Sequence, residues 1–233
     1  MASTATGHGP SSAGDFEIYR HRHDRLDLTV MPLNVRHIED VIRDEDNCRA
    51  RNLPDKFEGP VCVDGSFIVK HNYNTTLAGN IWINQKLSAS TNTLEHRGKV
   101  TVSASADLLN SKWQSEEISV GPTGEVVYGC LILQGKGMIK ARNTYVRRLL
   151  HNYADADYAI GGTVIVDGNV KVAHGSVLRV DDLVVLGDLH VHSNALLIAH
   201  KVTVRGTAIV DTGGQFAADE MNGCGRIRIN LEK

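Results

Sequence analysis

The residues best suited to chemistry in this sequence are histidines, of which there are 11. Two pairs are separated by one residue, His21 with His23 and His190 with His192. Alternate residues of a strand face the same side, so each pair would place two imidazoles on one surface. Imidazole nitrogens bind zinc and other transition metals when three or four ligands converge on one point. The histidines therefore raise the question of a metal site.

Acidic residues stand at a fixed interval from some of these histidines. Asp181, His200 and Asp219 follow one another at an interval of 19, and Asp211 follows His192 at the same interval. An exposed ladder of His and Asp is worth about a few tenths of a kcal/mol per pair and makes its histidines easier to protonate. We favour this ladder over a metal site, and we expect neither a metal nor a cofactor.

Motifs of the common catalytic and nucleotide-binding sites are missing from the sequence. It contains no GxGxxG, GxxxxGK[ST] or GxSxG. The histidines do not have a spacing that fits a trimeric β-helical zinc enzyme. The repeat differs from that of the hexapeptide acyltransferases, and the Asp and basic residues do not cluster as in polysaccharide lyases. We therefore expect no catalytic residues and no nucleotide-driven assembly.

A repeat near the C-terminus must position these side chains. Gly168, Gly187, Gly206 and Gly225 recur at an interval of 19, and apolar residues recur at the same interval. The apolar columns are Val164/Leu183/Val202/Met221, Val170/Leu189/Ala208/Ile227, Val172/Val191/Val210/Ile229, Leu178/Leu197/Phe216 and Val180/Ala199/Ala218. Each repeat thus holds three apolar-x-apolar pairs, the alternation of a strand with one buried face. Repeats of about twenty residues are typical of solenoids.

The sequence therefore predicts an all-β fold, a single-stranded parallel three-sided β-helix with about 19 residues per rung. We expect the four glycines at a corner, where a Cβ would clash or need a positive φ. The pattern recurs earlier: Val61–Val69 matches the Val164 copy, and Ile118–Val120 follows Val100–Val102 at an interval of 18. In Leu131–Gly135, an apolar-x-apolar segment precedes a glycine by two positions, as Val164–Val166 precedes Gly168.

Five segments follow from these patterns. They are a disordered tail (1–14), a strand and capping helix (15–60), a first solenoid block (61–140), a helical or loop insertion (141–162) and a second block (163–233). The helix would begin at Asn34 and use Val35, Ile38, Val41 and Ile42 to cover the first rung. In the insertion, Tyr145 and Tyr153 would share a helical face, with Arg147 and Arg148 opposite. This segment is either a loop packed on the solenoid or a docking surface for another protein.

Composition narrows the function classes. The formal net charge of −2 gives no long-range attraction to nucleic acid. Cys48, Cys62, Cys130 and Cys224 are widely spaced, and the first residues show no secretory signal, so we expect reduced thiols and a cytoplasmic protein. No apolar run reaches the length of a membrane span, so any membrane contact would be peripheral.

The repeats resemble those of bactofilins, the polymer-forming cytoskeletal proteins of bacteria. The resemblance rests on variants of Val-x-Gly-x-Val-x-Val at Val166–Val172, Val185–Val191 and Val204–Val210, and on Ile118–Val126 followed by Gly129–Leu131. It implies a right-handed β-helix that polymerises end to end without nucleotide, with flexible tails that in some members attach to a membrane. This chain departs from the family in its long N-terminal segment, its interrupted core and its polar last residues, Asn230–Lys233.

The function that these patterns favour is a self-assembling scaffold or filament subunit whose partner is another copy of itself. Self-association would use the end rungs, through Val61 and Val63 at one end and Ile227 and Ile229 at the other. One alternative is a virion or surface fibre that packs side by side, although the outer column Lys171, His190 and Ile209 is polar. Another is a zinc-dependent or acyl-transfer enzyme on a β-helix.

Overall fold

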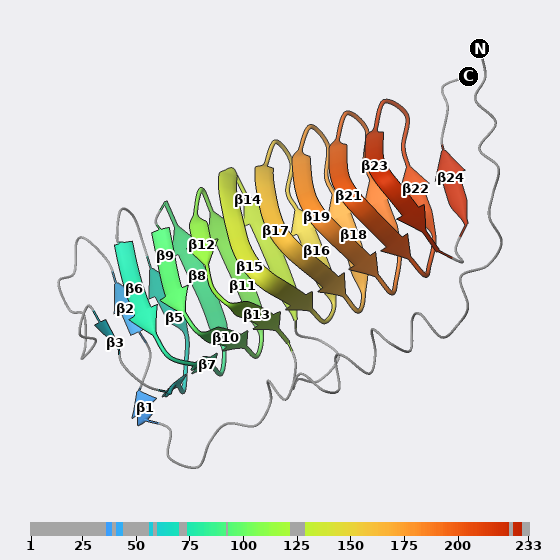
Figure 1. Cartoon of the computed structure of the whole chain (residues 1–233). Coiled ribbons are helices and arrows are strands. Elements are labelled where there is room, and N and C mark those ends of the chain that lie inside the picture. Colours follow the sequence, from blue (N-terminus) through green and yellow to red (C-terminus); the bar gives the residue numbers. More distant parts are fainter. Residues whose placement is uncertain are drawn as a thin grey trace.

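The computed structural model shows a parallel β-solenoid of about eight turns (Figure 1). It describes residues 36–38, 41–43, 56–57, 60–69, 74–91, 93–121, 129–223 and 226–229. Every strand pairing in these ranges is parallel, and none of their residues is helical. Accordingly, no helix among these residues is long and apolar enough to cross a membrane.

Each turn has three sides, as the three apolar pairs per repeat predicted. The first face contains β1 (Arg36–Ile38), β4 (Val61–Val63), β7 (Ile81–Ile83), β10 (Lys99–Val102) and β13 (Glu117–Val120). The second contains β2 (Val41–Arg43), β5 (Phe67–Val69), β8 (Lys86–Ser90), β11 (Ser105–Leu109), β14 (Cys130–Gln134), β16 (Leu149–Asn152), β18 (Asn169–Val172), β20 (Leu189–Val191), β22 (Ala208–Val210) and β24 (Ile227–Ile229). The third begins with β3 (Lys56–Phe57), β6 (Asn74–Ala78), β9 (Thr93–Arg97) and β12 (Lys112–Gln114).

Five long strands join the third face of one rung to the first face of the next. They are β15 (Lys136–Val146), β17 (Asp157–Val166), β19 (Val177–Val185), β21 (Leu196–Val204) and β23 (Gln215–Asn222). The first part of β15 pairs with β12 on the third face, and its last part pairs with β13 on the first face. The pairing of β15 with β17 shifts register between these two parts, where the chain turns the corner.

The interval of 19 is confirmed in the C-terminal rungs. Val170, Leu189, Ala208 and Ile227 are register partners in successive strands of the second face. The predicted columns that begin at Val164 and Leu178 are register partners too, on the first and third faces. Except for Met221 and Ile227 in the last described rung, their side chains point into one continuous apolar core that runs through the three faces. Stacked small and branched residues suit this core because each rung repeats the shape of its neighbour.

The predicted corner glycines also align. The amide of Gly187 donates to the carbonyl of Gly168 at 2.9 Å, and that of Gly206 donates to the carbonyl of Gly187 at 3.0 Å. A Cβ on Gly187 would come within 2.6 Å of the Gly168 oxygen, so lack of space, not a positive φ, requires glycine there. Gly225 lies outside the described residues.

The predicted insertion at 141–162 is wrong, because these residues wind through β15, β16 and β17 as an ordinary part of the coil. The extra residues lie earlier. Ile118 pairs with Thr144, 26 positions later, whereas Val100 pairs with Ile118 after 18. Gly121 and Gly129 flank residues 122–128, which are outside the described ranges, and the two glycines come close together. Leu131 consequently stacks under Leu150 and Val170 on the second face, not in the Val164 column.

The predicted capping helix between Asn34 and Asp46 is wrong for the residues that the structure describes there. Arg36–Ile38 is β1, paired with β4, and Val41–Arg43 is β2, paired with β5. The spacing of Ile38, Val41 and Ile42 fits a helix, but an existing sheet edge offers backbone hydrogen bonds that an isolated short helix lacks. The tail at 1–14 lies outside the described residues.

Candidate functional site

The two predicted end surfaces differ in the structure. Val61 and Val63 are buried in the core, because β1 adds a further strand outside β4. They are therefore not a free end, and that part of the self-association prediction is wrong. At the other end, Ile227 is 58% exposed although its column partner Ala208 is 2% exposed. The side chain of Ile229 lies outside the described residues.

The predicted docking residues do not share one surface. Tyr145 is buried on the outer side of the first face in a small cluster with Ile165 and Val184, and its hydroxyl donates to Asp167 at 3.5 Å. Tyr153 follows β16 on the outer side of the second face, half exposed, and stacks on His151 with ring centroids 4.1 Å apart. Arg147 and Arg148 form the turn between them, where their amides donate to the carbonyls of Val120 and Gly129. A strand places neighbouring residues on alternate sides, which the assumed helix would not.

The second face brings His190, His192 and Asp211 together. Nε2 of His190 lies 2.9 Å from Oδ2 of Asp211, and Nδ1 of His192 lies 3.3 Å from the same oxygen. The two imidazoles stack with centroids 3.8 Å apart. The sequence predicted the contact of His192 with Asp211. It missed the contact of His190, which reaches the neighbouring column of the next rung.

The electrostatics around these rings differ from the prediction that carboxylates ease protonation. The pKa of His192 is lowered, first by partial burial and then by His190 and Lys171, and Asp211 does not reverse this. The pKa of His151, the register partner of Lys171 on β16, is lowered by burial, Lys171 and His192. Desolvation and positively charged neighbours thus favour the neutral imidazoles of His151 and His192.

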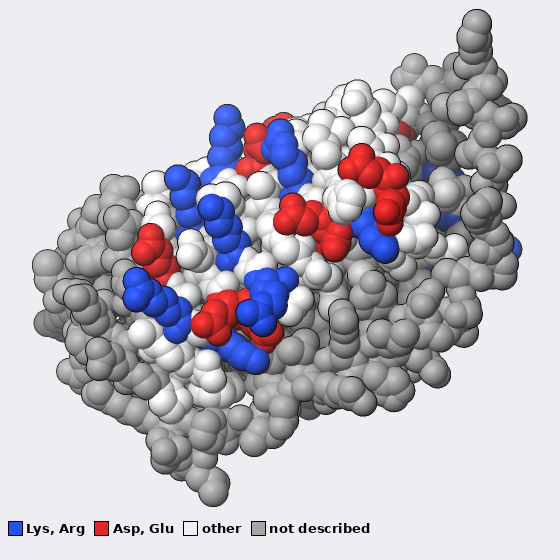
Figure 2. Space-filling model, viewed as in Figure 1, with Lys and Arg blue, Asp and Glu red and all other residues white. Residues whose placement is uncertain are grey.

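The third face carries the other predicted ladder. Nδ1 of His200 lies 3.0 Å from Oδ2 of Asp219, and this contact raises the pKa of His200 as predicted. Asp181 instead accepts a hydrogen bond from the amide of Gly162 at 2.7 Å. These side chains border an open trough of about 620 Å³ along β15 to β23, where Arg179 also pairs with Asp157. Figure 2, which shows this side of the molecule, has acidic and basic side chains interspersed over the described surface.

His96 and Tyr158 are among the buried polar side chains that the sequence did not predict. His96 is buried and has its Nε2 2.6 Å from the carbonyl of Gly79 and its Nδ1 3.3 Å from Ser115 Oγ. Burial lowers the pKa of His96 to about 4. The buried Tyr158 hydroxyl donates to the carbonyl of Leu108 at 3.1 Å, and burial raises its pKa to about 12. Both residues stand at positions of the alternating pattern that face the core, and this alternation is the sequence signal that could have identified them as buried.

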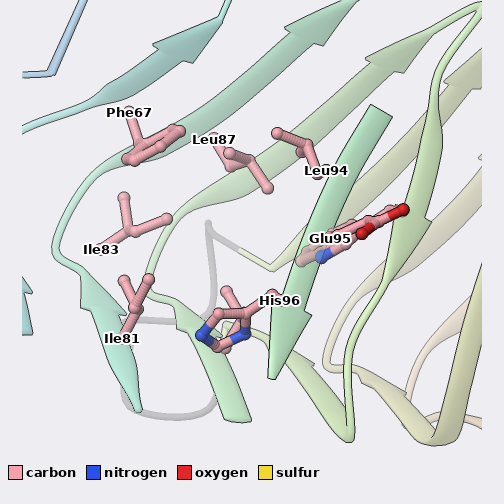
Figure 3. A pocket seen from close by; sticks show the side chains of 9 residues that line it. Phe67, Ile81, Ile83, Leu87, Leu94, Glu95 and His96 are labelled. Atoms are coloured by element: carbon pink, nitrogen blue, oxygen red, sulfur yellow. The ribbon is translucent and has the colours of Figure 1, made fainter. Parts of the chain in front are cut away.

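The void beside His96 is small. Figure 3 shows Phe67, Ile81, Ile83, Leu87 and Leu94 around it, with the imidazole of His96 beside Ile81. Its volume is about 20 Å³, room for one water molecule and not for an organic ligand. The void is therefore a packing defect of the core and not a ligand site. We assign His96, which lies next to it, a role in the structure of the core.

The cysteines in the described ranges, Cys62 and Cys130, add no reactive site. Cys62 and Cys130 are free thiols, and burial together with Asp64 raises the pKa of Cys62 to about 11. A thiol with so high a pKa is a poor nucleophile. Cys48, Cys224 and the pair His21 and His23 lie outside the described residues.

No protein-family model, curated protein or solved structure matches the chain.

Proposed function

We propose that this protein is a structural subunit that self-associates through the C-terminal end of its β-solenoid, without nucleotide, to build a scaffold or filament. The observation that carries the proposal is the exposure of core-column side chains at that end. Ile227 and Met221 are 58% and 40% exposed, whereas their partners one rung earlier, Ala208 and Val202, are buried. The same columns that hold the rungs together thus continue to the last described rung.

Strand edges at this end support the same proposal. Among the described strands, β24 pairs with β22 and β23 pairs with β21, so each presents one edge to the next rung position. Unpaired edges of parallel strands are templates for another strand in the same register. Burying a few hundred Å² of apolar surface there would contribute several kcal/mol at about 25 cal/mol per Å², before the cost of association. The resemblance of three consecutive rungs to bactofilin repeats also favours assembly along the coil axis.

The test is the size of the purified protein as a function of concentration, by light scattering and negative-stain microscopy, with and without ATP or GTP. We expect rods that lengthen with concentration and ignore nucleotide. Ile227→Asp should shorten them, because the charge would be buried in each junction. Ile198→Asp is the matched control: Ile198 is 37% exposed, but it lies on the outer side of the third face.

The two variants separate end stacking from lateral packing. If Ile198→Asp dissolves the assembly and Ile227→Asp leaves it intact, the copies pack side by side, as in a fibre bundle. A single monomer peak across the whole concentration range would contradict self-assembly itself.

A further inference from the structure

We propose that His190, His192 and Asp211 form a binding site for one divalent transition-metal ion, with zinc as the reference ion. The inference is independent of self-assembly. It rests on the convergence of three donor side chains: His190, His192 and Asp211 each offer one ligand atom, and these three atoms lie within 4.8 Å of one another.

The spacing of these atoms fits a shared ion. Zinc lies about 2.0 to 2.2 Å from its nitrogen and oxygen ligands, so tetrahedral ligand atoms are about 3.3 Å apart. The two histidine nitrogens lie 2.9 and 3.3 Å from Oδ2 of Asp211. The ligand nitrogens of the two histidines lie within 4.8 Å of each other, so rotation of these side chains would bring all three ligand atoms to bonding distance of one ion.

The backbone holds the ligands in place. His190 lies on β20 and His192 directly follows this strand, and Asp211 directly follows β22 on the next rung. The amide of Asp211 donates to the carbonyl of Val191 at 2.9 Å, and the amide of His192 donates to the carbonyl of Val172 at 2.9 Å. Sites built on paired strands need little reorganisation to bind, which favours a defined geometry.

The donor set determines the class of ion. Two imidazoles and one carboxylate suit zinc, cobalt, nickel, copper or ferrous iron, whereas calcium and magnesium prefer oxygen ligands alone. The three side chains are partly exposed, at 28%, 35% and 25%. This exposure leaves positions open for water or for a ligand from another molecule.

Two other features of the structure, Lys171 and the pair of His200 with Asp219, provide variants that test the site. Lys171 is the register partner of His190 on β18, and its positive charge opposes a bound cation. His200 and Asp219 form a contact of similar length, 3.0 Å, on the third face, but Asp181 is held by the amide of Gly162 and no second histidine joins them among the described residues. That pair is a control with the same residue types and no third converging donor.

The experiment is equilibrium dialysis of the full-length, tag-free protein against Zn²⁺ after treatment with a chelator, with metal analysis of the protein. Visible absorption with Co²⁺ as a second probe reports the coordination geometry. We expect one Zn²⁺ per chain. His192→Ala and Asp211→Asn should each weaken binding by at least about tenfold. His200→Ala should leave it unchanged, and Lys171→Met should strengthen it. Circular dichroism verifies that each variant is folded.

Three results would overturn the site. The first is the absence of stoichiometric Zn²⁺ at micromolar free metal in the unaltered protein. The second is undiminished binding by folded His192→Ala or Asp211→Asn. The third is binding that disappears in His21→Ala/His23→Ala or in His200→Ala, since that would place the ion elsewhere.

Discussion

The ring of Tyr158 occupies the space that Gly137 leaves without a side chain, and its hydroxyl reaches the backbone two rungs away. Gly137 is the register partner of Tyr158 on β15. The amide of Ser111 donates to the Tyr158 hydroxyl at 3.3 Å, and that hydroxyl donates to the carbonyl of Leu108 at 3.1 Å. One side chain thus ties three consecutive rungs together inside the coil.

Tyr158→Phe should destabilise the fold because it leaves the buried Leu108 carbonyl and Ser111 amide without this partner. Loss of a buried hydrogen bond of this kind costs about 1–3 kcal/mol. Urea denaturation measures the loss. Tyr153→Phe is the control, since the exposed Tyr153 should change stability by less than about 0.5 kcal/mol. Equal losses of unfolding free energy in the two variants would mean that the buried hydrogen bonds of the Tyr158 hydroxyl do not stabilise the fold.

Gly187→Ala should destabilise the protein by about 1–3 kcal/mol, because a Cβ there meets the backbone of the preceding rung. Gly161→Ala is the matched control on the same coil. The atom nearest to a Cβ at Gly161 is Asp181 Oδ2, at 3.7 Å, and Gly161 is not among the glycines with positive φ. We expect it to be neutral or slightly stabilising. Similar denaturation midpoints for the two variants would show that the glycine column is not sterically required.

Stability should fall as pH decreases from about 6.5 to 4, owing to His96. Its folded-state pKa of about 4 lies below the ordinary 6.5, so the unfolded chain binds the proton first and stability is complete only above pH 6.5. A shift of this size corresponds to roughly 3 kcal/mol. The check is a series of urea titrations across this range. His96→Gln should flatten the profile, although His151 and His192 add a slope of the same sign. An unchanged slope would contradict the buried neutral imidazole.

The pKa of His200 should be shifted in the direction opposite to that of His96, upward. The hydrogen bond to Asp219 raises its pKa, so the imidazolium that pairs with the Asp219 carboxylate forms below the raised value and is lost as pH rises through it. NMR titration of the imidazole resonances should show Asp219→Asn lowering this pKa. Asp211→Asn should leave it unchanged, because Asp211 contacts His190 and His192 instead. A shift caused equally by both substitutions would point to a general charge effect.

Part of the candidate chemistry could be read from spacing alone. The contacts of His200 with Asp219 and of His192 with Asp211 follow from the interval of 19, since residues one rung apart become vertical neighbours. The contact of His190 with Asp211 joins adjacent columns, and spacing does not say which way a side chain leans. The direction of the His192 pKa also escaped prediction, because it depends on burial and on Lys171.

The amino-acid sequence by itself determined the coil: the alternation of apolar residues and the interval of 19 specify a buried strand face and its vertical neighbours. Only the tertiary structure decided the course of the chain where the interval departs from 19. It showed that residues 141–162 wind through β15, β16 and β17, that the interval between paired residues lengthens between β13 and β15, and that Val61 is buried beneath β1. The physical reason is that hydrogen-bond register between rungs depends on the whole sheet. A local helical pattern yields when a strand edge offers its backbone partners.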